Sequence, residues 1–180
     1  MWQLNNPKPV KLIIGILAAD QHCLSKANQV LTTAFGKFDF VSDIWPFGQT
    51  DYYRDQTGGH IIRQFVSIKK LVDPGKLAGI KHRTNQLEQK LANQLAFDLP
   101  RPVNLDPGLI EPSKLVLATT KNYSHRIYIG DKMYAEVTLI FDKGQWHPFE
   151  YTYPDYRQKC YFDFFEKVRT QLLEQLKSQR

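Results

Sequence analysis

The sequence predicts an α+β fold, with a mainly antiparallel mixed sheet and helices packed on one face, in a single domain over residues 1–180. Residues 11–19 form a continuous apolar run, which is typical of a central strand buried on both faces. The opening elements follow the order β-α-β-β-α, which resembles the split βαβ arrangement of ferredoxin-like domains. Of the 180 residues, 42% are hydrophobic, so the chain is able to bury one large core.

The first half of the chain contains two helical patterns separated by strands. After the first strand, apolar residues recur at helical spacing up to Gly36, which is a typical C-terminal helix signal. Residues 38–47 and 61–72 predict strands, and a polar loop at 48–60 separates them. Asp73-Pro74 predicts the start of a helix of about 20 residues, because aspartate caps helices and proline suits the first helical position.

The second half is rich in β structure and ends in a long helix. Residues 100–112 predict an irregular, proline-rich segment with a turn at 104–108. Short strands are predicted at residues 114–119, 125–129, 133–141 and 146–151. From residue 154 onward the apolar residues again follow a helical period, so we expect a long C-terminal helix.

The positive charge of the chain is concentrated in one sector. The net charge is +6, and residues 60–126 hold 11 Lys or Arg against five Asp or Glu, so the whole excess lies there. A basic sector favours anionic partners. The sequence therefore leaves open a small anionic ligand, a nucleic acid such as RNA, or a lysine-rich surface that only aids solubility.

Several common functional signatures are absent. The sequence has no phosphate-binding loop of the form G-x-x-x-x-G-K-[ST], no G-x-G-x-x-G, no H-E-x-x-H and no G-x-S-x-G. Cys23 and Cys160 lie far apart in sequence, so we predict reduced thiols and no metal site. The apolar run at 12–19 is too short to cross a bilayer, and residues 1–9 lack an apolar signal core. We expect a cytoplasmic protein without a membrane partner, and the sequence indicates neither a cofactor nor an oligomeric state.

The predicted hairpin around Gly130 is the best candidate for a binding site. Its apolar faces match when residue 128 pairs with 134 and residue 126 with 136, which leaves the loop Gly130-Asp131-Lys132. One face of the hairpin then gathers cationic, acidic, phenolic and hydroxyl groups, namely Arg126, Glu136, Tyr128, Tyr134 and Thr138.

This polar face suits a ligand that carries a negative charge. A guanidinium matches a carboxylate or phosphate, so Arg126 and Lys121 would hold the anion. Tyr128 and Tyr134 would orient the ligand, with Thr138 on the same face. An ordinary cross-strand ion pair on a solvated face is the alternative explanation.

Two residues of this region are candidates for proton transfer, and two further cations are candidates for binding. His125 and Glu136 would act as acid and base near neutral pH. Lys81, on the edge of a predicted helix, and Arg63, in the basic sector, would add to the ligand-binding residues. The sequence leaves open whether the protein is an enzyme, and a non-catalytic assembly subunit is a further alternative.

The chain resembles an uncharacterised bacterial family, domain of unknown function 4416. Long strings carry the resemblance in order along the chain: KPVKLIIGILAAD at 8–20, TDYYRDQ at 50–56, TNQLE at 84–88, VNLDPG at 103–108, KLVLATTKNYSHRIYIGDKMYAEVTLIF at 114–141 and TYPDYR at 152–157. The resemblance implies a bacterial cytoplasmic protein. Some members are labelled GTP-binding proteins, and the resemblance supplies no catalytic residues.

Overall fold

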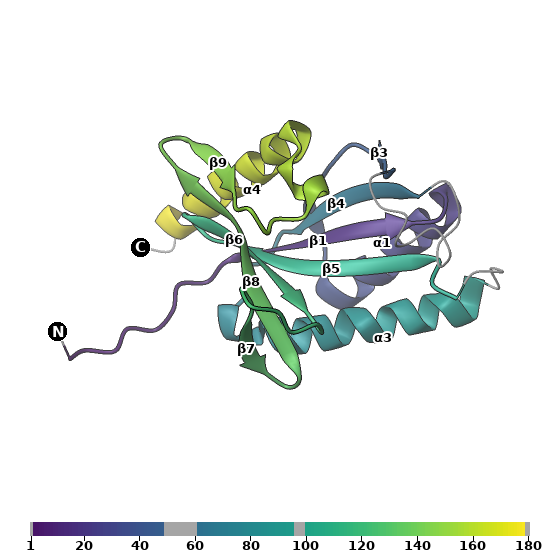
Figure 1. The fold of residues 1–180 in the computed structure, drawn as a ribbon, viewed down its shortest axis with the longest axis horizontal. Coiled ribbons are helices and arrows are strands. Elements are labelled where there is room, and N and C mark those ends of the chain that lie inside the picture. The colour runs from purple at the N-terminus through teal and green to yellow at the C-terminus, as the bar shows by residue number, and fades with distance from the viewer. Residues whose placement is uncertain (1, 49–60, 96–99, 179–180) are drawn as a thin grey trace.

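A single antiparallel sheet organises the chain (Figure 1). The structure, a computed structural model, describes residues 2–48, 61–95 and 100–178. The strands within these ranges are β1 (Lys11–Ala18), β2 (Phe38–Val41), β3 (Trp45–Pro46), β4 (Ile62–Ile68), β5 (Val103–Ile110), β6 (Lys114–Thr119), β7 (Ile127–Gly130), β8 (Met133–Asp142) and β9 (Gln145–Pro148). The helices are α1 (Gln21–Phe35), α3 (Leu77–Leu95) and α4 (Lys159–Ser178), with short 3-10 helices η2 (Pro74–Lys76) and η3 (Pro154–Arg157).

The ferredoxin-like opening is confirmed. The sheet order is β2-β4-β1-β5-β6-β8-β7, so β1 lies between β4 and β5 and pairs antiparallel with both. The next strands along the path, β6, β8 and β7, extend this core sheet beyond β5. Asp73 caps η2 as expected, because its carboxylate accepts a hydrogen bond of 2.8 Å from Gly75 N.

Two hydrophobic clusters cover the two faces of the sheet. Leu12, Ile14 and Ile16 of β1 point toward α1 and α3, whereas Ile13 points toward an aromatic cluster formed largely by α4. Phe65 of β4 lies at the centre of that aromatic cluster. The prediction that helices pack on one face therefore holds for α1 and α3, while α4 covers part of the opposite face (Figure 1).

Three local predictions need correction. Residues 38–47 form two short strands, β2 and β3, instead of one, and β4 ends at Ile68. The segment at 100–112 is not irregular: β5 occupies most of it and pairs with β1 along its whole length, which overrides the local preference of Pro107 and Gly108 for a turn. The predicted loop at 48–60 lies mostly outside the described residues.

The hairpin register is correct at its centre and wrong at its tip. Tyr128 pairs with Tyr134 as predicted, but Gly130 pairs with Met133, so the loop has two residues, Asp131 and Lys132. Both loop residues have positive φ, of 50° and 60°, as two-residue hairpin loops of type I′ require.

In the described ranges, none of the helices combines the length and apolar character needed to cross a membrane.

Gly108 is required by the close approach of β6. A Cβ atom at this position would lie 2.6 Å from Leu117 Cδ2 and 3.0 Å from the Val116 backbone oxygen. We predict that Gly108→Ala lowers the free energy of unfolding by about 1–3 kcal/mol, because the backbone of β6 must shift. Gly79→Ala is the matched control: Gly79 is exposed in α3 with nothing near its Cβ position, so this substitution should stabilise the protein by about 0.5–1 kcal/mol. Urea unfolding of both variants measures the difference, and equal effects would contradict the assignment.

Candidate functional site

Strands β5 and β6 pair at residues 108–110 and separate on the N-terminal side of Gly108. This separation shapes the site. Glu111 N donates to Lys114 O at 2.9 Å, so by alternation the backbone groups of residues 109 and 107 also face β6. Residue 107 is proline, which has no N–H to donate. The β5–β6 pairing accordingly ends at Gly108 and Leu117, while β6 continues beside β8.

Side chains of α3 replace the missing strand partner at Leu105. By the same alternation, the backbone groups of Leu105 face the gap that β6 leaves. Leu105 N donates to Glu88 Oε1 at 2.7 Å, and Leu105 O accepts from Lys81 Nζ at 3.0 Å. Residues 81 and 88 are two helical turns apart, so both reach the same stretch of β5. The break in the ladder thus draws an ammonium and a carboxylate into the interior, where they are 4% and 8% exposed.

A chain of polar contacts connects these two residues along β5. Glu88 Oε2 accepts from Arg101 Nη2 at 2.6 Å, and the same nitrogen donates to Asn104 Oδ1. Asn104 Nδ2 donates to Asp106 Oδ2 at 2.5 Å, and Lys81 Nζ lies 3.4 Å from Asp106 Oδ1. Asn104 and Asp106 lie on the same face of β5, as residues two apart in a strand do.

The two carboxylates of this chain have pKa values shifted in opposite directions. Burial raises the pKa of Glu88, although Lys81 and Arg101 oppose the shift. Burial also acts to raise the pKa of Asp106, but the positive charges of Lys81, Arg63 and Arg101 outweigh it and the pKa is lowered. Asp106 is therefore held ionised at neutral pH.

A buried ion pair forms a second part of the site. Arg63, on β4, is 3% exposed, and its Nη2 donates to Asp155 Oδ2 of η3 at 2.8 Å. The guanidinium carbon lies 5.1 Å from the Phe47 ring centroid, 5.3 Å from that of Phe65 and 5.6 Å from that of Tyr156. Burial raises the pKa of Asp155, with Arg63 opposing the shift.

The hairpin contributes a third group of contacts, centred on Glu136. Glu136 is 4% exposed, and its Oε2 lies 2.8 Å from Arg126 Nε and 3.2 Å from His125 Nε2. Its Oε1 accepts from Thr138 Oγ1 at 3.3 Å. Both carboxylate oxygens of Glu136 are thus engaged, which suits it to hold Arg126 in place more than to exchange protons.

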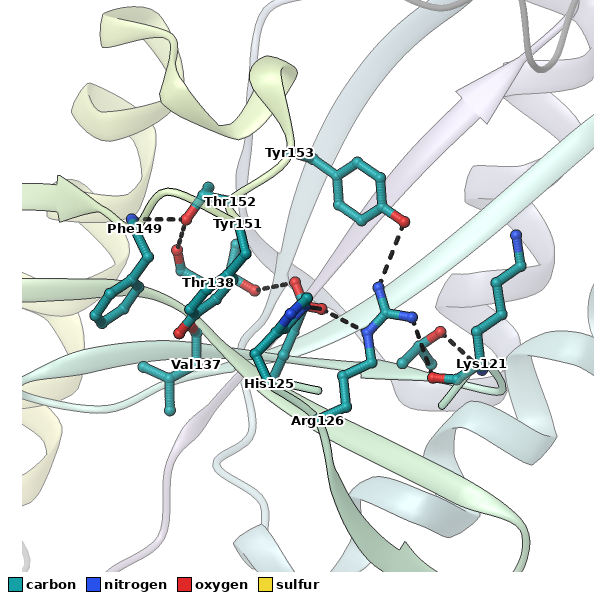
Figure 2. A network of polar contacts seen from close by, with 11 residues as sticks. Lys121, His125, Arg126, Val137, Thr138, Phe149, Tyr151, Thr152 and Tyr153 are labelled. Atoms are coloured by element: carbon teal, nitrogen blue, oxygen red, sulfur yellow. Dashed lines mark hydrogen bonds and ion pairs between the residues drawn. The ribbon is translucent and has the colours of Figure 1, made fainter. Parts of the chain in front are cut away.

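Arg126 extends from this group toward two other segments. Its Nη1 donates to the Lys121 backbone oxygen at 3.1 Å, and its Nη2 donates to Tyr153 Oη at 3.4 Å (Figure 2). The guanidinium therefore bridges the end of β6 and the segment that leads into η3.

All three groups line one pocket of about 470 Å³ on the face of the sheet that α4 covers in part. Five cationic side chains and three carboxylates contribute to its wall: Arg63, Lys81, Arg101, Lys121 and Arg126, with Asp106, Glu136 and Asp155. Hydroxyl, amide, phenol and apolar groups complete it, among them Thr119, Thr120, Asn104, Tyr153, Tyr156, Phe47 and Leu117. The pocket thus has more positive than negative side chains and many hydrogen-bonding groups.

The structure brings five of the residues predicted from sequence to this pocket, namely Arg63, Lys81, Lys121, Arg126 and Glu136. The other four lie outside its wall. Thr138 is buried behind Glu136, and His125 stacks on Tyr151 with ring centroids 4.1 Å apart. Tyr128 and Tyr134 pack against each other edge to face, 5.5 Å apart, on the hairpin.

Sequence reasoning missed the contributions of β5 and η3. The sequence predicts a turn at Asn104 and Asp106 because proline and glycine follow them, although two polar residues spaced two apart are also a strand signal. Asp155 pairs with Arg63 from 92 positions away, a separation for which the sequence carries no signal. Within the ranges the structure describes, no three His, Cys, Asp or Glu side chains are grouped so as to hold a metal ion.

Comparison with known proteins identifies a family and nothing beyond it. The family described as Domain of unknown function (DUF4416) matches residues 8–172. No curated protein and no solved structure matches the chain.

The lowered pKa of Asp106 predicts a pH-dependent contribution to stability. A carboxyl group whose pKa is lowered by folding stabilises the fold at pH values above its ordinary pKa of 3.8. This contribution is lost as the pH falls through the pKa of the folded state. Asp106→Asn should lower the free energy of unfolding by about 1–2 kcal/mol at pH 7, and the deficit should narrow below pH 3.8. Urea unfolding between pH 3 and 7 measures it, with Asp163→Asn as an exposed control. A deficit that is constant across this range would contradict the electrostatic explanation.

Proposed function

We propose that this protein, which belongs to the DUF4416 family, binds a small anionic ligand in the pocket between β5, β6, β8 and η3. The ligand class is a nucleotide or a phosphorylated or carboxylated metabolite. The observation that carries the proposal is the convergence of five cationic side chains, which supply charged hydrogen-bond donors, on one pocket whose wall also holds three carboxylates.

The cations of the pocket come from the basic sector of the sequence. Of the 11 Lys and Arg residues at 60–126, five line the pocket instead of an outer surface. Two of these, Arg63 and Lys81, are nearly fully buried. A pocket lined by cations favours a compact ligand over the extended backbone of a nucleic acid, which is bound by an exposed basic surface.

Arg126 and Lys121 are positioned to contact the anionic group. Arg126 is oriented by Glu136 on one edge and by the Lys121 carbonyl on another, so its guanidinium is fixed before a ligand arrives. Lys121 is exposed at the end of β6, next to Thr119 and Thr120, whose hydroxyl groups also line the pocket. A phosphate or carboxylate group matches this combination of charge and hydrogen-bond donors.

We predict that Arg126→Ala and Lys121→Ala each weaken ligand binding by about tenfold or more, because each removes a charge-assisted hydrogen bond worth about 1.5–3 kcal/mol. Native mass spectrometry of the purified protein, followed by calorimetric titration against phosphorylated and carboxylated metabolites, measures the change. Arg83→Ala is the matched control, since Arg83 belongs to the same basic sector but is exposed on α3 outside the pocket.

Two outcomes would reject the proposal. In the first, no anionic compound binds. In the second, an RNA oligonucleotide binds with strong salt dependence and loses affinity in Arg83→Ala but not in Arg126→Ala, which would place an anionic polymer on the outer surface.

A further inference from the structure

Buried polar atoms without a hydrogen-bond partner gather around Arg63. In the described part of the chain, such atoms include Nε and Nη1 of Arg63 and the hydroxyl oxygens of Tyr156 and Tyr161. Asp155 accepts a hydrogen bond of 2.8 Å from Nη2 of this guanidinium. We call these four residues the Arg63 corner. A native structure rarely leaves several buried donors unpaired in one place, so this concentration requires an explanation.

Two of these donors converge above Gly15 of β1. A Cβ atom at Gly15 would lie 2.9 Å from Arg63 Nη1 and 3.1 Å from Tyr156 Oη, so the glycine makes room for both groups. Arg63 and Tyr156 line the pocket, whereas Tyr161 does not. One side of the corner therefore belongs to the proposed binding site.

Donors outnumber acceptors in the corner, where Asp155 and the two phenol oxygens are the acceptors. A guanidinium carries five N–H donors and no acceptor. Burial raises the pKa of Tyr156 well above its ordinary value and that of Tyr161 to about 12, so both phenols keep their protons. A group that fills this corner must supply acceptor oxygen atoms.

The charges nearby indicate that this acceptor is neutral. Asp155 already balances the charge of Arg63, and Asp106 lies close enough to influence the pKa of both residues. A ligand carboxylate here would add unbalanced negative charge to a buried site, which is strongly unfavourable. A carbonyl oxygen has two lone pairs, no proton and no net charge, so it can accept from both Arg63 and Tyr156.

We propose that Arg63 and Tyr156 bind a carbonyl oxygen of the ligand, which makes the ligand an anionic compound that also carries a keto or amide carbonyl. The inference rests on the proposed function, and it assigns Arg126 and Lys121 to the anionic end. In this structure the two donor atoms are covered, and the Phe47 ring lies beside the guanidinium. Phe47 lines the pocket, so the carbonyl group reaches the corner by displacing that ring.

Two phosphorylated trioses that differ at one carbon test the inference. Dihydroxyacetone phosphate carries a carbonyl at C2, and glycerol 3-phosphate carries a hydroxyl there. The wild-type protein should bind the ketone about tenfold more tightly by calorimetric titration. Its carbonyl oxygen accepts from both Arg63 and Tyr156, whereas the hydroxyl adds one more donor to a corner where unpaired donors already outnumber acceptors.

Two matched variants test whether the preference for the ketone comes from the Tyr156 hydroxyl. Tyr156→Phe should reduce the tenfold preference to near unity, chiefly by weakening the binding of dihydroxyacetone phosphate. Tyr161→Phe is the control: it removes an equally buried hydroxyl that lies outside the pocket wall, and it should keep the full preference. Both variants retain the aromatic ring, and Tyr156→Phe loses only an unpaired donor, so Tyr156→Phe should not have a lower melting temperature than wild type.

The outcomes separate this inference from the proposed function. Equal affinity of the wild type for the two trioses, or a preference that survives in Tyr156→Phe, overturns the carbonyl assignment and indicates that ordered water satisfies the corner. Binding of neither triose, with other anions still bound, overturns it as well. Failure of every phosphate and carboxylate to bind removes the proposed function itself.

Discussion

The interruption of the β5–β6 ladder at Pro107 is the constraint on which the rest of the pocket depends. A buried backbone N–H or C=O without a partner costs about 1–3 kcal/mol, so Leu105 requires substitutes for the strand that has turned away. Glu88 and Lys81 provide them from α3. A carboxylate and an ammonium in the interior must in turn be paired, since an unpaired buried charge is far more costly than an unpaired amide. The chain of contacts through Arg101 and Asn104 follows from that need.

The same separation of strands explains why the pocket lies where it does. On the face of the sheet opposite α1 and α3, the aromatic residues of α4 cover one half, with Phe65 at their centre. The other half begins where β6 leaves β5, and there the wall is built from charged and hydroxyl-bearing side chains. Arg63 stands at the boundary, with aromatic rings around its guanidinium and Asp155 on its outer edge. Apolar packing and polar recognition therefore meet at one residue.

The sequence supports the fold more strongly than the site, for physical reasons that differ between elements. The apolar run of β1 and the helical spacing of apolar residues in α1 and α3 are direct signs of buried strands and helix faces. The order of these elements along the chain therefore predicts the ferredoxin-like opening. The hairpin register also follows from alternation, up to the tip, where the positive φ angles of Asp131 and Lys132 select a shorter loop. By contrast, β5 carries Pro107 and Gly108, whose local preference is a turn, and only pairing with β1 makes the segment a strand. The contacts between Arg63 and Asp155, and between Lys81 and Leu105, are tertiary and leave no local pattern.

The charge balance of the pocket determines what kind of recognition it is able to perform. Asp106, Glu136 and Asp155 each lie within ion-pair distance of a cation, and Glu88 stands behind Arg101, so little of the positive charge is unbalanced. Long-range attraction, which salt screens over about 10 Å, is correspondingly modest. Selectivity must then come from short-range geometry, in which fixed donors meet acceptor atoms of the ligand after water has been removed. Since Glu136 and the Lys121 carbonyl already fix the position of Arg126, the structure favours a ligand chosen by the placement of its oxygen atoms over one chosen by its total charge.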